Sequence, residues 1–242
     1  MKIERANLSE SIYREIRMQL MNGEHPPGER LRIGMLAEQF GVSITPVRES
    51  IFRLVSEGAL VMRAATDVSV PVLTAHQLRE IQLTRALLEG ACAERAASLI
   101  DAPTIDRLER IQRDYIAAWK RRAPDVAQRN REFHFVLAAA GDMPIVFGIV
   151  ERMWVMMGPT IAVFLSTLKP RKLTVEGHEH TPVIRALRAR DAVAAREAIQ
   201  ADIRWSDAIV EWVERESGMP VAETVGARAS RMRTHQPKGV TP

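Results

Sequence analysis

The stretch LRIGMLAEQFGVSITPVRESIFRLVSEGAL, residues 31–60, decides the fold of the first part of this 242-residue chain. Its apolar residues recur at helical spacing on both sides of GVSITP, which is a tight turn. We predict a short helix over 33–40 and a second helix that starts at the N-cap Thr45 with Pro46 and ends before Gly58. The residues expected to form its core are Leu36, Ala37, Phe40, Val42, Val47, Ile51 and Leu54.

The segments on both sides complete a recognisable order of elements. Asn7 or Ser9 can cap a helix that runs to Asn22, where NGEHPPGE breaks it with glycine and proline. After Gly58 the short segments ALVMR and VSVPV predict a two-stranded hairpin around AATD. Helix, helix, turn, helix and hairpin is the order of a winged helix-turn-helix, to which we assign residues 1–72.

From Thr74 onward the sequence predicts helices and no further strand. The six expected helices cover residues 75–100, 103–122, 125–140, 143–168, 172–189 and 191–214. The predicted fold class is therefore mainly α, with a winged helix followed by an all-α, six-helix antiparallel bundle over residues 73–217. We expect the tail, residues 218–242, to be disordered.

Composition excludes several classes of protein. A hydrophobic content of 46% allows a substantial core and excludes a disordered chain. The opening MKIERANLSE lacks the apolar segment of a signal peptide, and Gly158 and Pro159 interrupt the apolar run from Met153 to Leu165. The single cysteine, Cys92, excludes an internal disulfide and suits a small buried position. We expect a cytoplasmic protein that does not span a membrane.

The net charge of +4 does not by itself identify a nucleic-acid-binding protein. Residues 1–72 hold nine Lys/Arg and nine Asp/Glu, residues 73–217 hold 21 and 20, and the tail holds four and one. A DNA-binding prediction must therefore depend on where the charges lie.

The quoted stretch resembles the winged-helix domain of the GntR family of transcription regulators, without gaps from LAEQFGVS through TPVRES to EGAL. In such a domain the start of the recognition helix contacts base edges, and flanking cations contact phosphates. The DNA-contacting residues that we predict are Arg30, Arg32, Ser43, Thr45, Arg48, Arg53 and Arg63. Arg48 can bind O6 and N7 of guanine, or it can clamp a phosphate or pair with Glu49 or Glu38.

Two residues depart from the family pattern. Ile44 occupies the place of an arginine that usually contacts DNA, and Asp67 lies near the usual glycine of the wing. Asp tolerates a left-handed conformation, so the wing can form, but its charge would repel a phosphate. We expect DNA binding with an unusual sequence preference; a scaffold that has lost DNA binding is the alternative.

Three later segments resemble the FCD domain, the ligand-binding domain of one branch of that family. They are REIQLTRALLEGACAERAA (79–97), NREFHFVLAAAGDMP (130–144) and EHTPVIRALRARDAVAAREAIQADI (179–203). The expectation of six helices indicates the smaller, vanillate-regulator-like subgroup. The resemblance implies a small-molecule effector and a homodimer on double-stranded operator DNA.

Arg85, on the first of these segments, is a charged residue at a position where the helical pattern predicts an apolar one. It lies in the middle of an apolar stripe formed by Leu78, Ile81, Leu88, Cys92, Ala96 and Leu99. An arginine that faces a core needs an anion, and this anion is either Glu89, one turn later, or the carboxylate of a ligand. The resemblance favours the ligand, a small organic acid, whose apolar part would pack on Trp154, Met157 or Trp205; these three residues are also ordinary core residues.

Four polar residues on three predicted helices face the core, and such groups must meet one another or a bound species. The resemblance maps the divalent-metal ligands of the FCD branch onto Asn130, His134, His180 and Asp202. Two imidazoles and one carboxylate suit zinc, nickel or manganese, with Asn130 as a weak fourth donor. A hydrogen-bonded pocket that binds an organic effector without metal is the alternative.

The function that we predict is a ligand-responsive DNA-binding transcription regulator, a repressor of a catabolic operon. A two-His, one-carboxylate site also occurs in metal-dependent enzymes. A metal-dependent enzyme, however, does not require the helix-turn-helix segment GVSITPVRES followed by a wing. We therefore expect a regulator without enzymatic activity.

Overall fold

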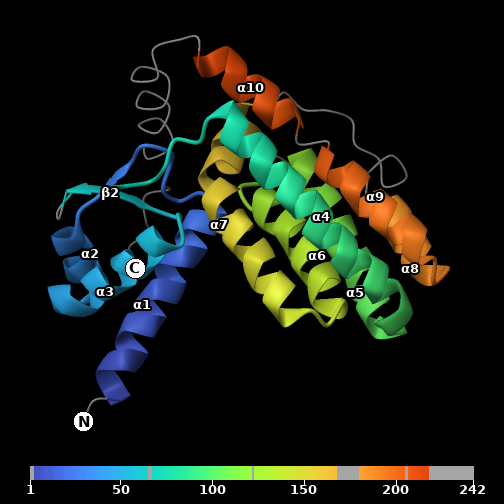
Figure 1. Ribbon diagram of the computed structural model, residues 1–242, viewed down its shortest axis with the longest axis horizontal. Helices are drawn as coiled ribbons and strands as arrows, with labels where there is room; N and C mark the ends of the chain where they lie inside the picture. Colours follow the sequence, from blue (N-terminus) through green and yellow to red (C-terminus); the bar gives the residue numbers. More distant parts are fainter. Residues whose placement is uncertain (1–2, 65–66, 122, 168–179, 205–206, 218–242) are drawn as a thin grey trace, which may run out of the picture.

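The structure, a computed structural model, describes residues 3–64, 67–121, 123–167, 180–204 and 207–217 (Figure 1). A small N-terminal module lies beside a larger bundle of helices, and the extended segment 70–74 joins the two. The boundary predicted at residues 72–73 falls within this segment. The tail expected to be disordered lies outside the described residues.

The N-terminal module is a winged helix, as predicted. Its helices are α1 (Ile3–Asn22), α2 (Ile33–Phe40) and α3 (Ile44–Ser56), and its strands are β1 (Arg30–Leu31), β2 (Val61–Ala64) and β3 (Asp67–Ser69). The hairpin β2–β3 was predicted, whereas β1 was not. β1 pairs antiparallel with β3, so the sheet order is β1-β3-β2. Two residues are too short to show the alternation that identifies a strand.

The starts of α1 and α3 differ from the prediction. α1 begins at Ile3, so Asn7 and Ser9 lie inside the helix and do not cap it. The N-cap of α3 is the extended residue Ser43 and not Thr45, which lies in the first turn. Pro46 is tolerated there because the first turn of a helix has no intrahelical partners for its N–H groups.

The remaining described residues form seven helices. They are α4 (Ala75–Leu99), α5 (Ala102–Arg121), α6 (Val126–Ala140), α7 (Pro144–Thr167), α8 (His180–Arg188), α9 (Ala192–Arg204) and α10 (Asp207–Ser217). The expected helices correspond to α4, α5, α6, α7 and α8 and, for residues 191–214, to α9 together with α10 (Figure 1). Residues 205–206, between α9 and α10, lie outside the described residues. The predicted order of a winged helix followed by a helical domain is confirmed.

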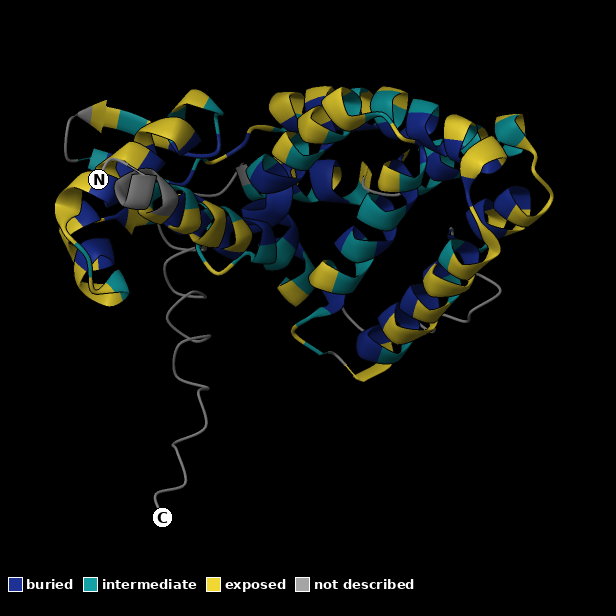
Figure 2. Cartoon of the chain, turned by 90° about the horizontal axis from the view of Figure 1, so that it is seen from below, coloured by how far each residue is buried: buried dark blue, intermediate teal, exposed yellow. Residues whose placement is uncertain are grey.

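One hydrophobic core runs through both parts of the molecule. It joins buried residues of the winged helix, such as Ile16, Leu20 and Ile51, with Val150 of α7 and Val213 of α10. A second cluster joins the later half of α4 with α5, α6, α8 and α9. Figure 2 shows the buried residues of these helices turned toward one another. The winged helix is thus packed onto the bundle rather than merely tethered to it.

α7 is long and apolar enough to cross a membrane by length and composition alone, and 44% of its apolar window is buried inside the protein. Pro159 lies within the helix and does not end it. Trp154, Met157, Ile161 and Phe164 on this helix belong to the core shared with α1 and α4. We interpret α7 as a core helix, whose apolar faces are explained by packing.

Candidate functional site

α3 presents the face predicted to read DNA. Val47, Ile51 and Leu54 are completely buried and anchor the helix, while Ser43, Thr45 and Arg48 are exposed at its start. None of the ion pairs within the described residues involves Arg48. Glu49, one of its two possible internal partners, instead accepts a hydrogen bond from Ser9 Oγ at 2.6 Å. Arg48 is therefore available to a partner outside the protein.

The other predicted cations differ in how far their charges are already paired. Arg32 and Arg63 are exposed. Arg53 donates to Glu10 at 2.5 Å, lies 3.5 Å from Glu57 and stacks on the Tyr13 ring at 3.7 Å. Arg53 thus fastens α3 to α1, a role that its sequence position does not show.

The two departures from the family pattern have simple structural settings. Ile44 is 48% exposed at the first position of α3. Asp67 does not adopt a left-handed conformation, because it is the first residue of the strand β3. Its carboxylate lies 3.7 Å from Arg30, which reduces the repulsion that we expected it to exert on a phosphate.

His134, His180 and Asp202 come together from α6, α8 and α9 inside the bundle. Their nearest ligand atoms all lie within 4.8 Å of one another. Nε2 of His134 is 3.1 Å from Asp202 Oδ2, and Nε2 of His180 is 3.5 Å from Asp202 Oδ1. Both imidazoles are buried, and the Asp202 side chain is 11% exposed. Three of the four predicted metal ligands are therefore brought to one place.

The remaining ring nitrogens of the two histidines are held by neighbouring side chains. His134 Nδ1 is 2.6 Å from Glu89 Oε2, and His180 Nδ1 is 2.6 Å from Gln112 Oε1. The His180 ring also stacks on Phe133 at 3.8 Å. Hydrogen bonds of this kind fix the orientation of metal-binding imidazoles, and here they direct both Nε2 atoms toward Asp202.

Arg85 has an internal partner. Its Nε donates to Glu89 at 2.6 Å, its guanidinium lies over the Trp154 ring at 4.0 Å, and Nη1 is 3.4 Å from Met157 Sδ. Trp154 Nε1 also donates to Glu89, at 3.3 Å. Two of the predicted effector residues, Arg85 and Trp154, thus contact Glu89, and the third, Met157, contacts Arg85. Through Glu89 a continuous network connects Arg85 to His134.

Opposite charges stabilise the ionised forms within this network. Burial raises the pKa of the Glu89 carboxyl, but the charges of Arg85 and His134 outweigh it and hold this pKa at about 2. Burial lowers the pKa of His134, but Glu89 and Asp202 outweigh it and raise this pKa. The imidazoles of His180 and His134 hold the pKa of Asp202 well below its usual value despite burial. The network is therefore built around two carboxylates.

Sequence reasoning missed the central position of Glu89 and the part of Gln112. Glu89 was recognised only as a partner for Arg85, although it lies one turn from Arg85 on the same buried face of α4. Gln112 is 2% exposed on α5, and nothing in its sequence setting distinguishes it from a surface glutamine. Asn130 is half-buried one turn before His134. Trp205 lies outside the described residues.

Comparison with known families agrees with both parts of the fold. Residues 8–66 match the model of the bacterial regulatory proteins of the gntR family, and residues 80–204, more than half of the chain, match that of the FCD domain. The chain belongs to the GntR family. Within this family the exposed start of α3 lies in the DNA-binding domain, and the buried His134–His180–Asp202 cluster lies in the FCD domain.

Individual GntR-family proteins are similar over nearly the whole chain. The HTH-type transcriptional regulator McbR of Escherichia coli K12 is 30% identical over 86% of this chain and 95% of its own length. The HTH-type transcriptional repressor RspR of the same organism is 23% identical over 87% of this chain and 92% of its own length. The solved structure of E. coli McbR/YncC superposes with a TM-score of 0.78 at 29% identity, covering 85% of this chain and 97% of that one.

These likenesses decide between the predicted functions. The family and its members named above are transcription regulators, so this GntR-family chain is a ligand-responsive DNA-binding transcription regulator and not an enzyme. The two-His, one-carboxylate cluster therefore belongs to a regulator.

Proposed function

We propose that this regulator is a repressor of a catabolic operon and that a small organic acid is its effector. We also propose that it acts in the cytoplasm as a homodimer on operator DNA.

We further propose that His134, His180 and Asp202 hold a divalent metal, zinc, nickel or manganese, which takes part in effector binding. The observation that carries the metal proposal is the orientation of both Nε2 atoms toward one carboxylate.

The chemistry of the cluster fits such a metal. Imidazole nitrogen and carboxylate oxygen are ordinary ligands of zinc, nickel and manganese. Ligand atoms that lie about 2.0–2.2 Å from a tetrahedral zinc ion are roughly 3.4 Å from one another. The separations of 3.1 and 3.5 Å between the imidazole nitrogens and the Asp202 oxygens are close to this value. Glu89 and Gln112 would orient the two imidazoles for this role. When bound, the metal would supply a Lewis acid that attracts the carboxylate of an effector.

Metal content tests this site directly. Protein purified without chelator should carry about one divalent ion per chain, and His134→Ala or His180→Ala should lose it. Asn130→Ala should matter less because a neutral amide oxygen is a weak ligand beside imidazole and carboxylate. After the metal has been stripped with a chelator, zinc added at about 100 times the Kd of the site should stabilise the wild type by about 2.7 kcal/mol.

The matched control is His76→Ala, since His76 is a surface histidine with an 81% exposed side chain. This variant should keep its metal, as measured by elemental mass spectrometry. If the wild type is metal-free and its melting temperature does not respond to zinc, nickel or manganese, the hydrogen-bonded pocket without metal is the better description.

The effector is expected to bind beside the cluster. Arg85 and Trp154 donate hydrogen bonds to Glu89, which also contacts His134, and Met157 packs against the Arg85 guanidinium. Because the Arg85 guanidinium already pairs with Glu89, an effector carboxylate would have to share it. The proposal that Arg85 contacts the effector therefore competes with a simpler role, in which Arg85 positions Glu89 and, through it, His134.

Calorimetry separates these two roles. We expect Arg85→Lys to weaken the best ligand from a panel of hydroxy, keto, sugar and aromatic acids by about tenfold, since lysine keeps the charge but lacks the planar fork. Metal content should not change in this variant. If the ligand binds the wild type and Arg85→Lys equally well, Arg85 does not contact the effector, and the regulator assignment is unaffected.

A further inference from the structure

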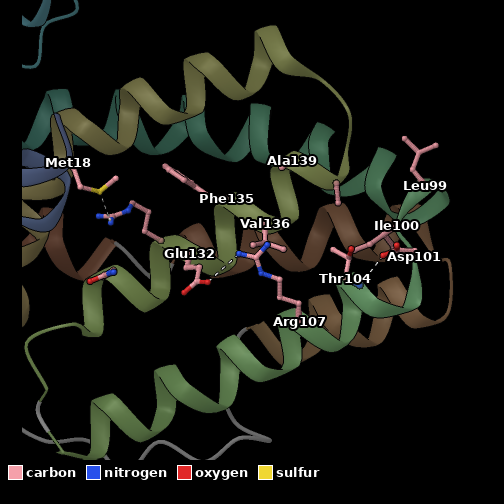
Figure 3. Close-up of a pocket in the computed structure, with 13 residues that line it drawn as sticks. Met18, Leu99, Ile100, Asp101, Thr104, Arg107, Glu132, Phe135, Val136 and Ala139 are labelled. Carbon is pink, nitrogen blue, oxygen red and sulfur yellow. Dashed lines mark hydrogen bonds and ion pairs between the residues drawn. The ribbon is translucent and has the colours of Figure 1, made fainter. Parts of the chain in front are cut away.

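A cavity lies along a face of α6 that does not include His134. It has a volume of about 650 Å³, and its lining comes from α5, α6 and the end of α4, with Met18 of α1 at one end (Figure 3). None of His134, His180 and Asp202 lines it. Small-molecule sites in proteins commonly have volumes of about 300–1,000 Å³. The cavity is therefore large enough for a small organic molecule and separate from the polar cluster.

The walls combine apolar side chains with charges that are mostly paired. Phe135 and Val136 of α6 and Ile100 at the end of α4 supply apolar surface. Arg107 lies 3.4 Å from Glu132 across the cavity wall (Figure 3). Asp101, also on the wall, accepts a hydrogen bond from the backbone of Thr104. These polar groups have partners within the protein.

Arg131 is different, because it is a buried cation whose partners are neutral. It is 6% exposed, and its Nη1 donates to the Met21 carbonyl at 2.7 Å. Its Nη2 donates to Asn22 Oδ1 at 2.8 Å and lies 3.6 Å from Met18 Sδ. None of the ion pairs among the described residues includes Arg131. Burial lowers the pKa of Arg131 and outweighs the attraction of Glu132, which acts on Arg131 without forming an ion pair with it. Burying a charge that has no ion-pair partner is costly, so this end of the cavity favours an anion.

We propose that this cavity is a second ligand site, which takes an organic anion with an apolar body. The carboxylate or phosphate of the ligand lies toward Arg131, and its apolar part lies on Phe135, Val136 and Ile100. Met18 is 45% exposed and covers the guanidinium with a flexible thioether, so it can move aside to admit the ligand. This site goes beyond the proposed metal and effector site, from which it differs in every lining residue.

The position of Arg131 gives this site a consequence for DNA binding. Its two hydrogen bonds hold the C-terminal end of α1, and α1 in turn holds α3 through Ser9, Tyr13 and Glu10. An anion at Arg131 competes with the Met21 carbonyl and the Asn22 amide. Ligand binding therefore loosens α1 from α6 and changes the support of the recognition helix.

The test uses 2-naphthoate as the anionic probe, with 2-naphthylmethylamine and 2-naphthylmethanol as cationic and neutral probes of similar shape. Calorimetry on full-length protein should show saturable binding of 2-naphthoate, about tenfold or more tighter than that of the amine. Ala139→Trp should abolish this binding, because Ala139 is an exposed residue that lines the cavity. Val193→Trp is the matched control, since Val193 is 50% exposed on α9 and does not line it.

Two further variants identify the site that is occupied. Arg131→Met should weaken 2-naphthoate by about tenfold or more, and Ala139→Trp keeps the test valid if the loss of Arg131 unfolds the protein. His134→Ala should bind 2-naphthoate as the wild type does, even if the metal proposal fails. Equal binding of the amine and the acid overturns the proposal, as does binding that survives Ala139→Trp but is lost in His134→Ala.

Discussion

At the scale of single residues, the recognition helix contains arginines that look alike in sequence but are held differently. Arg48 and Arg53 lie one and a half turns apart on α3, and both were predicted to contact DNA. Arg53 is engaged by Glu10, Glu57 and Tyr13 within the protein, whereas Arg48 extends from the start of the helix, where base edges are read. The two residues should therefore contribute to different properties of the protein.

We predict that Arg48→Ala weakens binding to an operator, obtained by selection from random duplex DNA, by about 1–3 kcal/mol. Fluorescence anisotropy of labelled DNA measures this, and Arg110→Ala is the control, because Arg110 is an exposed arginine on α5. If Arg48 contacts a base, the substitution should lower the preference for operator over random DNA. If Arg48 contacts a phosphate, the substitution should weaken binding to both kinds of DNA equally. An unchanged affinity would show that Arg48 is not part of the interface.

At Ile44 we expect a changed sequence preference rather than a loss of DNA binding. An arginine at the start of a recognition helix offers hydrogen bonds to guanine or phosphate, whereas an exposed isoleucine offers only apolar contact. In the major groove the matching apolar group is the methyl of thymine. The exposure of Ile44 at the first position of α3 is thus consistent with DNA binding that has an altered sequence preference.

At the scale of elements, the contact between α1 and α7 depends on a glycine. A Cβ added at Gly158 would lie 2.6 Å from the Leu20 carbonyl oxygen and 2.8 Å from Met21 Cα, both backbone atoms of α1. Arg131 of α6 holds the same end of α1. The backbones of α1 and α7 therefore pack closely where the winged helix contacts the FCD domain, and position 158 has no space for a residue larger than glycine.

We predict that Gly158→Ala lowers the free energy of unfolding by about 1–3 kcal/mol, because α1 must move away from α7. Gly148→Ala is the matched control on the same helix, since a Cβ there meets nothing within 4 Å. This control should raise stability by about 0.5–1 kcal/mol, the usual gain of alanine over glycine in a helix. Urea denaturation gives both values, and similar effects of the two substitutions would contradict the close approach of α1.

At the scale of the whole molecule, the polar cluster and the winged helix are connected through α6. His134 and Arg131 lie three residues apart on this helix; His134 belongs to the polar cluster, and Arg131 contacts the end of α1. The core cluster shared by the two domains adds apolar contacts between α1, α4 and α7. Such packing allows a change in the FCD domain to reach α3 without a flexible linker between them.

We predict that the regulator is a homodimer that binds a near-palindromic operator, because two half-sites add their binding energies under two-fold symmetry. Its affinity should fall steeply with salt concentration, since phosphate contacts release counterions. Analytical ultracentrifugation at micromolar concentration and anisotropy titrations over a range of salt measure the two properties. A monomer, or binding that does not respond to salt, would contradict this assembly.

The sequence by itself determined the local structure and the kind of molecule. The turn GVSITP, the apolar spacing around it and the β-branched hairpin specify a winged helix, because these signals act between residues close in the chain. The residue types His134, His180 and Asp202 on core-facing positions indicated a polar site, because a core does not accept such groups without partners. Both inferences needed only helical periodicity and the chemistry of the side chains.

The tertiary structure alone decided which groups meet. Helical spacing gives the face on which a side chain lies but not its neighbours on another helix, so it could not place Glu89 between Arg85 and His134 or bring Gln112 to His180. Helical spacing could not show that Arg131 holds α1 either, because its partners Asn22 and Met21 are 109 and 110 positions away in the chain.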